Sequence, residues 1–437
     1  MKILKFGGTS VGSPERIRHV ARLCLDSGRN VVVLSAMSGT TNSLVEIADY
    51  LYKGNVPGAQ ETINSLRQKY RGVVADLFDS EDDRSQVTEL VEHRFNYISQ
   101  FTEGEFTAAE EKEILACGEL ISTALMLLYM RAIGVRAVML PALDYMRTLE
   151  GGEPDMKYIT SHLRRLIDSE PDADIWITQG YICRNCHGEV DNLRRGGSDY
   201  SASLIGAALN ADEIQIWTDI DGMHTGDPRY VNNTRPVSRL HFEEAAELAY
   251  FGAKILHPTC VLPAKLHNIP VRLLNTMQPE AQGTLIANFP PDGTIKAVAA
   301  KDPVTAIKIK SGRMLLAYGF LHKVFETFDN YNTAIDMMAT SEVGVTVTID
   351  NTEHLADIID EIKTFGTVTV DPDMVIICVV GDLDWKNGKD YAARAVDALR
   401  ELPVRMISYG GSNYNISMLV RAEDKIKALN LLNEKLF

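Results

Sequence analysis

The sequence is poor in the features that mark membrane, secreted and nucleic-acid-binding proteins. No apolar run in the chain approaches the ~20 residues of a membrane span, and Met1 leads into a predicted strand without the apolar core of a signal peptide. Acidic residues outnumber basic ones, 59 to 44, and the formal net charge is -15, which argues against nonspecific binding to nucleic acid or to an anionic membrane. We therefore expect a cytoplasmic protein without nucleic-acid or membrane partners.

Cysteine is scarce, and the six cysteines are dispersed, as expected for reduced thiols in a chain of 437 residues. One local cluster, Cys183, Cys186 and His187, matches the haem-attachment pattern and half of a zinc site. Haem c would require export, and zinc would need a second ligand pair that the sequence does not show. A surface hairpin carrying incidental cysteines is the favoured interpretation, and no metal ligand is expected from the protein.

Short β-branched runs alternate with helical patterns over about the first 275 residues, which predicts a doubly wound α/β domain with a mainly parallel sheet. The expected strands are residues 1–6, 30–35, 135–140, 173–178, 213–218 and 270–274, and the expected helices include 43–53, 58–131, 156–169, 198–209 and 242–254. In such sheets ligands bind beyond the carboxyl ends of the strands. Polar glycine turns fall at these ends, so we expect the site there.

The first of these turns carries Gly7, Gly8 and Gly12 between a strand and a helix start. Glycines let several backbone N–H groups point at one anion, and the positive end of the following helix adds to the attraction. Lys5 precedes the glycines, whereas the lysine of a Walker loop follows the last glycine, so the chain is not a P-loop NTPase. A plain tight turn is the alternative interpretation of this segment.

Four further segments carry candidate chemistry. Residues 194–199 place arginines and two glycines at a helix N-terminus, which suits a phosphate or carboxylate; a charged hairpin return with a good helix cap is the alternative. Glu119 lies in an apolar helix, either exposed on its far face or facing an amine in a cleft. The aspartates of loop 217–229 suit a metal or a nucleotide, although aspartates also make ordinary turns. Lys254 ends a helix, where the dipole favours a cation.

The pattern changes after Leu274. Residues 275–301 are rich in Pro, Gly and polar residues, and two similar helix–strand–strand–helix units follow. With strands at 305–310 and 374–380 before them, these units predict a duplicated βαββαβ arrangement, typical of small ligand-sensing or dimerising modules. We expect a catalytic domain at 1–290 and paired regulatory domains at 303–437.

Several motifs occur in a fixed order along the chain: Lys5-Phe6-Gly7-Gly8-Thr9-Ser10, Gly118-Glu119, Arg195-Gly196-Gly197-Ser198-Asp199, Thr218-Asp219 and Phe251-Gly252-Ala253-Lys254. In this order they resemble the motifs of monofunctional, lysine-sensitive aspartokinases, which belong to the amino acid kinase superfamily. The C-terminal duplication resembles the paired ACT domains of that family, and residues 340–343 resemble its effector-loop signature. The resemblance implies transfer of the γ-phosphoryl group of MgATP to the β-carboxylate of L-aspartate, the first step of lysine, threonine and methionine biosynthesis.

The resemblance also implies roles for individual residues. The β-carboxylate is already ionised at pH 7, so no general base is needed and the protein must align it and neutralise charge. Lys5, Gly7 and Gly8 would hold the transferring phosphoryl group, and Asp199 would orient Lys5. In the substrate pocket Arg195 would bind the α-carboxylate and Glu119 the α-ammonium, completed by Thr41 and Ser198. The ATP site would comprise Lys5, Thr218, Asp219, His224, Arg229 and Lys254, with Mg²⁺ held largely by the phosphates.

By the same resemblance the C-terminal part binds an amino-acid effector, lysine, and joins two chains in a homodimer through its ACT modules. The effector residues would be Met314, Phe320, Asp336, Thr340, Ser341 and Glu342. Leu316, Ala317 and Ala334 are apolar where relatives have polar residues, and lost hydroxyl contacts would weaken lysine inhibition. His224 stands where tyrosine is usual, and Val190-Asp191-Asn192 stands where the family often has a threonine run.

Three rival interpretations remain open. The first is another amino acid kinase, such as one acting on glutamate, although the duplicated sensor and the Phe6–Ser10 string disfavour it. The second is an inactive kinase domain that serves an amino-acid sensor, which the retention of the candidate lysines, acids and arginine disfavours. The third is the front half of an aspartokinase fused to homoserine dehydrogenase; the sequence ends at Phe437 and holds no dinucleotide domain.

Overall fold

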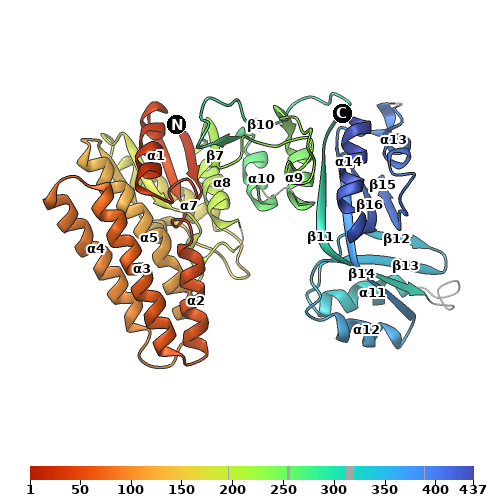
Figure 1. Cartoon of the computed structure of the whole chain (residues 1–437), viewed down its shortest axis with the longest axis horizontal. Coiled ribbons are helices and arrows are strands. Elements are labelled where there is room, and N and C mark those ends of the chain that lie inside the picture. Colours follow the sequence, from red (N-terminus) through yellow and green to blue (C-terminus); the bar gives the residue numbers. More distant parts are fainter. Residues whose placement is uncertain (195, 253–255, 311–318, 388) are drawn as a thin grey trace. The chain divides into compact units, whose positions relative to one another are not determined.

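The structure is a computed structural model that describes residues 1–194, 196–252, 256–310, 319–387 and 389–437. By its contacts the chain forms two compact units, Met1–Gly222 with Ile255–Asn288, and Met223–Lys254 with Phe289–Phe437 (Figure 1). Segment 223–254 lies within the predicted catalytic domain 1–290, yet it groups by contacts with the C-terminal residues.

The first unit is built on a sheet with the strand order β3-β4-β2-β1-β7-β9-β10. β1 lies in the middle, parallel to β2 on one side and to β7 on the other, and β10 is antiparallel to β9. The strands are β1 (Lys2–Phe6), β2 (Asn30–Leu34), β3 (Ala137–Leu140), β4 (Ile175–Gln179), β7 (Glu213–Thr218), β9 (Val271–Asn275) and β10 (Thr284–Ala287). Every residue of β2 is buried, as expected where both faces of a sheet are covered. The predicted doubly wound, mainly parallel sheet is confirmed.

The long helical pattern over residues 58–131 is three helices, α3 (Val56–Leu77), α4 (Glu81–Gln100) and α5 (Ala108–Ala132). They lie side by side with α2 (Thr40–Tyr52) in Figure 1 and contact one another. The other helices of this unit are α1 (Pro14–Asp26), α6 (Ala142–Tyr145), α7 (Met156–Asp168), α8 (Gly197–Leu209) and α10 (Pro258–Leu266). The side chains of Ser13 and Asn55 each accept a backbone N–H of the first turn, which fixes where α1 and α3 begin.

Helix α5 corrects one expectation from the sequence. By length and composition α5 could cross a membrane, and it is the one such helix among the described residues. The sequence had been expected to contain no apolar run close to the length of a membrane span. The apolar stretch of α5 is 78% buried inside the protein, as in the core helix of a globular domain. Ile114, Ile121 and Leu125 of α5 belong to the main apolar core, so this helix brings its central residue Glu119 to the sheet.

A short hairpin of β5 (Ile182–Arg184) and β6 (Val190–Asn192) follows β4, as predicted for the segment with the two close cysteines. Cys183 is buried in it and Cys186 is exposed at its turn. Among the described residues no group of three or more His, Cys, Asp or Glu side chains is placed to hold a metal ion.

The second unit contains a six-stranded sheet of order β12-β13-β11-β14-β16-β15. Its central strands, β11 (Ile295–Lys310) and β14 (Thr367–Gly381), run antiparallel, with register shifts between Lys301 and Ala306. The other strands are β12 (Met338–Ser341), β13 (Gly344–Ile349), β15 (Met406–Tyr409) and β16 (Asn415–Arg421), and a further short strand is β8 (Arg239–His241). The register shifts divide both long strands, so each strand serves two modules.

This pairing corrects the predicted order of the two modules. Residues 304–310 pair with 367–374 in the first module, whereas residues 295–301 pair with 376–381 in the second. No strand was predicted over residues 295–301, yet they supply a strand of the second module, so the first module is inserted into the second. This short apolar strand was not predicted because Pro290, Pro291 and Gly293 before it and Pro303 after it are typical of loops.

Each module has its own apolar core. Ile307, Phe320 and Val347 belong to the first core, and Val379 and Met418 belong to the second. The helices of the first module are α11 (Phe320–Asn330) and α12 (Leu355–Lys363), and those of the second are α13 (Tyr391–Ala398) and α14 (Lys425–Leu436), with short 3₁₀ turns η2 (Trp385–Asn387) and η3 (Ala422–Asp424). Helix α9 (Phe242–Tyr250) packs on β11 and β14, which explains why segment 223–254 groups with this unit.

Candidate active site

The turns after β1 and β2 meet at the carboxyl ends of these strands, beside the end of β7. The Ser38 N–H donates to the Gly8 carbonyl at 3.0 Å, and the Gly7 N–H donates to the Trp217 carbonyl at 3.3 Å. A Cβ on Gly8 would lie 2.6 Å from the Ala36 carbonyl oxygen, so glycine is required for this close packing of the turn after β1 on the turn after β2. The Gly7 amide was expected to face an anion; here it ties its turn to β7 instead.

Lys5, near the end of β1, forms an ion pair with Asp199 in the first turn of α8. Lys5 Nζ lies 2.6 Å from Asp199 Oδ1, and the two side chains are only 10% and 14% exposed. Gly196, just before α8, has φ of 75°, and a Cβ there would lie 2.4 Å from the Cβ of His257. A side chain at Gly196 would therefore displace the start of α8 and with it Asp199. This geometry is the one expected if Asp199 orients Lys5.

Glu119 is only 5% exposed and faces the end of β2. Its Oε1 accepts the Ala36 N–H at 3.2 Å. Burial raises the pKa of Glu119 to about 8, because the charged carboxylate loses its hydration there. The interpretation that Glu119 is exposed on the far face of its helix is therefore wrong. A cationic ligand group beside it would stabilise the carboxylate.

These residues surround a cavity of about 310 Å³. The cavity is lined by Lys5, Ser35, Thr41, Glu119, Tyr181, Arg194, Gly196, Gly197, Ser198 and Asp199. The structure thus brings together five predicted site residues from four separate sequence motifs: Lys5, Thr41, Glu119, Ser198 and Asp199. Arg195, predicted to bind the substrate α-carboxylate, lies outside the described residues, and its role stays a prediction.

Two lining residues were missed from the sequence, Ser35 and Tyr181, whereas Arg194 belongs to segment 194–199, which was predicted to suit a phosphate or carboxylate. Ser35 and Tyr181 follow the carboxyl ends of β2 and β4, so the rule that placed the glycine turns would also have found them. Tyr181 has φ of 68° and donates its N–H to the Ser201 hydroxyl at 3.0 Å, which holds its backbone against α8. Arg194 adjoins the predicted arginine and brings a guanidinium to the same cavity.

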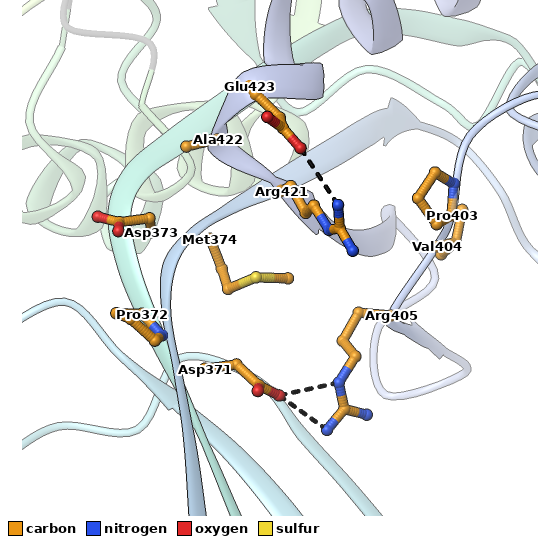
Figure 2. Close-up of a pocket in the computed structure, with 10 residues that line it drawn as sticks. All are labelled: Asp371, Pro372, Asp373, Met374, Pro403, Val404, Arg405, Arg421, Ala422 and Glu423. Atoms are coloured by element: carbon orange, nitrogen blue, oxygen red, sulfur yellow. Dashed lines mark hydrogen bonds and ion pairs between the residues drawn. The ribbon is translucent and has the colours of Figure 1, made fainter.

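A cavity of about 750 Å³ in the second unit is not the better candidate (Figure 2). Figure 2 shows Met374 between two arginines that are already engaged. Arg405 donates twice to Asp371 at 3.1 Å, and Arg421 donates to Glu423 at 3.2 Å. Each guanidinium is thus paired with a neighbouring carboxylate, and none of the residues that line this hollow belongs to the predicted site.

Comparison with known proteins identifies the family. Residues 1–275 match the model of the amino acid kinase family, and residues 377–436 match a model of the ACT domain. The lysine-sensitive aspartokinase 3 of Escherichia coli is 31% identical over 100% of this chain and 99% of its own length. The chain belongs to the aspartokinase family.

Solved structures of this family share the fold along the whole chain. E. coli aspartokinase III in complex with aspartate and ADP has a TM-score of 0.88 at 31% identity, covering 100% of both chains. The same enzyme in complex with lysine and aspartate has a TM-score of 0.81 at 32% identity, covering 100% of this chain and 99% of that one. The predicted fold, an amino acid kinase domain followed by ACT modules, is thereby confirmed.

The ATP residues predicted for this aspartokinase are divided between the two units. Thr218 ends β7 in the first unit, where its hydroxyl accepts the Ile220 N–H at 3.0 Å, and Asp219 beside it is exposed. His224 and Arg229 belong to the second unit. Arg229 is exposed and forms a two-pronged pair with Asp227, and His224 Nδ1 lies 3.2 Å from the Thr234 hydroxyl. Lys254 lies outside the described residues. The nucleotide roles of all five stay predictions.

The predicted effector residues occupy different environments in the first module. Met314, Leu316 and Ala317 lie outside the described residues. Phe320 packs in the apolar core, whereas Thr340, Ser341 and Glu342 are exposed at the edge strand β12 and the turn after it, and Ala334 is exposed as well. Asp336 is only 1% exposed, and its Oδ1 accepts Lys301 Nζ at 2.5 Å and the Tyr250 hydroxyl at 3.0 Å. Lys301 and Tyr250 therefore engage one oxygen of Asp336, whereas its Oδ2 is buried without a hydrogen-bond partner among the described residues.

Proposed function

We propose that this aspartokinase transfers the γ-phosphoryl group of ATP to the β-carboxylate of L-aspartate. The observation that carries the proposal is the single cavity that holds the Lys5–Asp199 pair and the buried carboxylate of Glu119. An ammonium for the phosphoryl group and a carboxylate for the substrate amine match the two charged ends of this reaction. No group in the protein needs to remove a proton, because the acceptor carboxylate is ionised at pH 7.

Alignment and charge compensation are then the main tasks of the protein. Lys5 would stabilise the negative charge of the transferring phosphoryl group, and its pair with Asp199 fixes the position of the ammonium before the substrate binds. Glu119 would bind the α-ammonium, while Thr41 and Ser198 line the same cavity for the rest of the amino acid. Mg²⁺, bound to the ATP phosphates, would neutralise part of their charge.

Trapping of the acyl phosphate with hydroxylamine tests the proposal. With MgATP, we expect hydroxamate from L-aspartate and none from L-glutamate. Hydroxamate from glutamate would instead favour an amino acid kinase that phosphorylates glutamate. No hydroxamate from either substrate, with ATP bound to folded protein, would favour an inactive kinase domain in an amino-acid sensor.

We also propose lysine as an inhibitory effector, a homodimer formed through the ACT modules and a cytoplasmic location. The ACT modules and the likeness to a lysine-sensitive aspartokinase support the effector. The edge strand β12 supports the dimer, because an edge strand offers unpaired backbone groups and Met338 on it is 39% exposed.

The Lys301–Asp336 pair leads to a prediction about inhibition. Lys301 Nζ bridges Asp336 Oδ1 and Asp350, so its ammonium already neutralises the carboxylate predicted for the effector amine. Lys301→Met removes this competing ammonium, and we expect the lysine concentration for half inhibition to fall about fivefold, the scale of one charge-assisted hydrogen bond partly offset by screening. Inhibition curves with the hydroxamate assay measure it.

Lys296→Met is the matched control, because Lys296 lies on the same strand and pairs with Asp292 instead. It should leave lysine inhibition unchanged. Loss of lysine sensitivity in Lys301→Met at an unaltered melting temperature would show that lysine does not exchange with Lys301 at Asp336.

A further inference from the structure

Helix α3 places two adjacent side chains on the turn between β2 and α2. Lys69 Nζ donates to the Ser38 carbonyl at 2.6 Å, and the Tyr70 hydroxyl lies 2.9 Å from the Thr40 hydroxyl. Tyr70 and Thr40 are fully buried, whereas Ser38 is exposed. Two hydrogen bonds therefore hold the turn to α3: a buried one with Tyr70 and a solvent-exposed one with Lys69.

This turn, residues 35–41, is called the substrate turn because it borders the cavity at both ends. Ser35 and Thr41 line the cavity, and the Ala36 N–H bonds to the carboxylate of Glu119. The Ser38 N–H bonds to the Gly8 carbonyl. A shift of the substrate turn would therefore move two cavity-lining side chains and alter the contacts of Glu119 and of the glycine turn.

The backbone of the substrate turn is held in a demanding shape. Gly39 has φ of 78°, and the position of a Cβ there would lie 3.7 Å from Lys69 Nζ. The acceptor of Lys69 is a neutral carbonyl rather than a carboxylate, so the ammonium makes a charge-assisted bond without losing its net charge. Tyr70 in turn packs against Phe95 of α4 with ring centroids 5.7 Å apart, which fixes the buried fastening.

We propose that Lys69 and Tyr70 are positioning residues that hold the substrate turn for the amino-acid substrate. The proposal rests on the proposed function, because it assigns the substrate turn to the aspartate side of that reaction. Neither side chain lines the cavity, so both act through Ser35 and Thr41. A loosened turn weakens substrate binding, whereas Lys5 and Asp199 are carried by β1 and α8, and their pair includes no residue of α3 or of the substrate turn.

Steady-state kinetics of Lys69→Met and Tyr70→Phe test the proposal. We expect each substitution to raise the KM for aspartate about fivefold and to change kcat by less than about twofold, on the scale of one hydrogen bond. Since both contacts fix one turn, the double variant should raise KM by clearly less than the product of the two single effects.

Two further variants separate positioning from general effects. Lys69→Arg keeps a cationic donor and should restore a KM close to that of the unsubstituted protein. Arg71→Met removes a cation from the same helix, but Arg71 bonds to Glu92 of α4 at 2.6 Å, so its KM should not change.

An unchanged KM in Lys69→Met, an equal rise in Arg71→Met, or a double variant equal to the product would each overturn the proposal. An effect in Lys69→Met with none in Tyr70→Phe would also overturn it, since the charge alone would then act. Formation of aspartyl hydroxamate by all variants would show that the proposed reaction stands even where the positioning proposal fails.

Discussion

Lys5→Met is expected to lower kcat by about 10³-fold, on the scale seen when a preorganised electrostatic contact to a developing charge is removed. Methionine fills the volume of the lysine stem but carries no charge for the transferring phosphoryl group. Because Lys5 Nζ lies 2.6 Å from Asp199 at a nearly buried site, the substitution also leaves that carboxylate without its partner. We therefore expect a lower melting temperature together with the loss of turnover, measured by thermal unfolding and by the hydroxamate assay.

Asp199→Asn combined with Lys5→Met separates these two effects. The double variant carries no unpaired carboxylate at this position, so its melting temperature should recover much of the loss. Its turnover should remain as low as that of Lys5→Met, because the ammonium is still absent. A kcat near that of the unsubstituted protein in either variant would contradict the role of Lys5.

Local patterns predicted the centre of the site because each one depends on neighbouring residues. The glycine turn after β1 and the glycine-rich start of α8 follow from short sequence signals, and the carboxyl ends of parallel strands must meet at one edge. Lys5 and Asp199 are far apart in the chain, but these signals predicted both of them at the same edge of the sheet. Their mutual distance and burial depend on the packing of α8 against β1, which no local pattern reports.

The parts that the sequence did not predict depend on long-range pairing. Residues 295–301 form a strand only because they pair with residues 376–381, and a segment flanked by prolines carries little local strand signal. The hydrogen bond from the Gly7 N–H to the Trp217 carbonyl likewise depends on how a turn and a strand from distant parts of the chain fit together. The contact of Lys69 with Ser38 joins a polar helix to a turn. From the sequence alone, a lysine on such a helix is usually interpreted as a solvent-exposed residue without a specific partner.

Glu119 leads to the second large effect, because aspartate binding should release a proton near pH 7. Burial holds the pKa of Glu119 at about 8, so the side chain is mostly protonated at pH 7 in the free protein. The substrate α-ammonium favours the carboxylate and lowers that pKa. The apparent affinity for aspartate should therefore rise as the pH rises from about 6 to about 8, and calorimetry in buffers of different ionisation enthalpy measures the released proton.

Glu119→Gln keeps the size of the side chain and an oxygen that can accept the Ala36 N–H, but it removes the charge. We expect the KM for aspartate to rise about 10- to 100-fold, the scale of a buried hydrogen bond to a charged group, and the proton release to disappear. If Glu119→Gln still releases a proton when aspartate binds, the proton comes from a group other than Glu119.

The same pKa makes an independent prediction about stability. The pKa of Glu119 is raised on folding from the ordinary value of 4.5 to about 8, so the folded state holds the proton more tightly. Its contribution to the free energy of unfolding is therefore full below about pH 4.5 and is lost as the pH rises through about 8. Glu119→Gln resembles the protonated side chain and should remove this part of the decline, so the two unfolding curves should nearly coincide at acidic pH and separate as the pH rises toward about 8, where the unsubstituted protein becomes the less stable of the two. A binding defect without this difference in pH dependence would mean that Glu119 is already ionised in the free protein, and that burial is outweighed by a positive charge within the cavity.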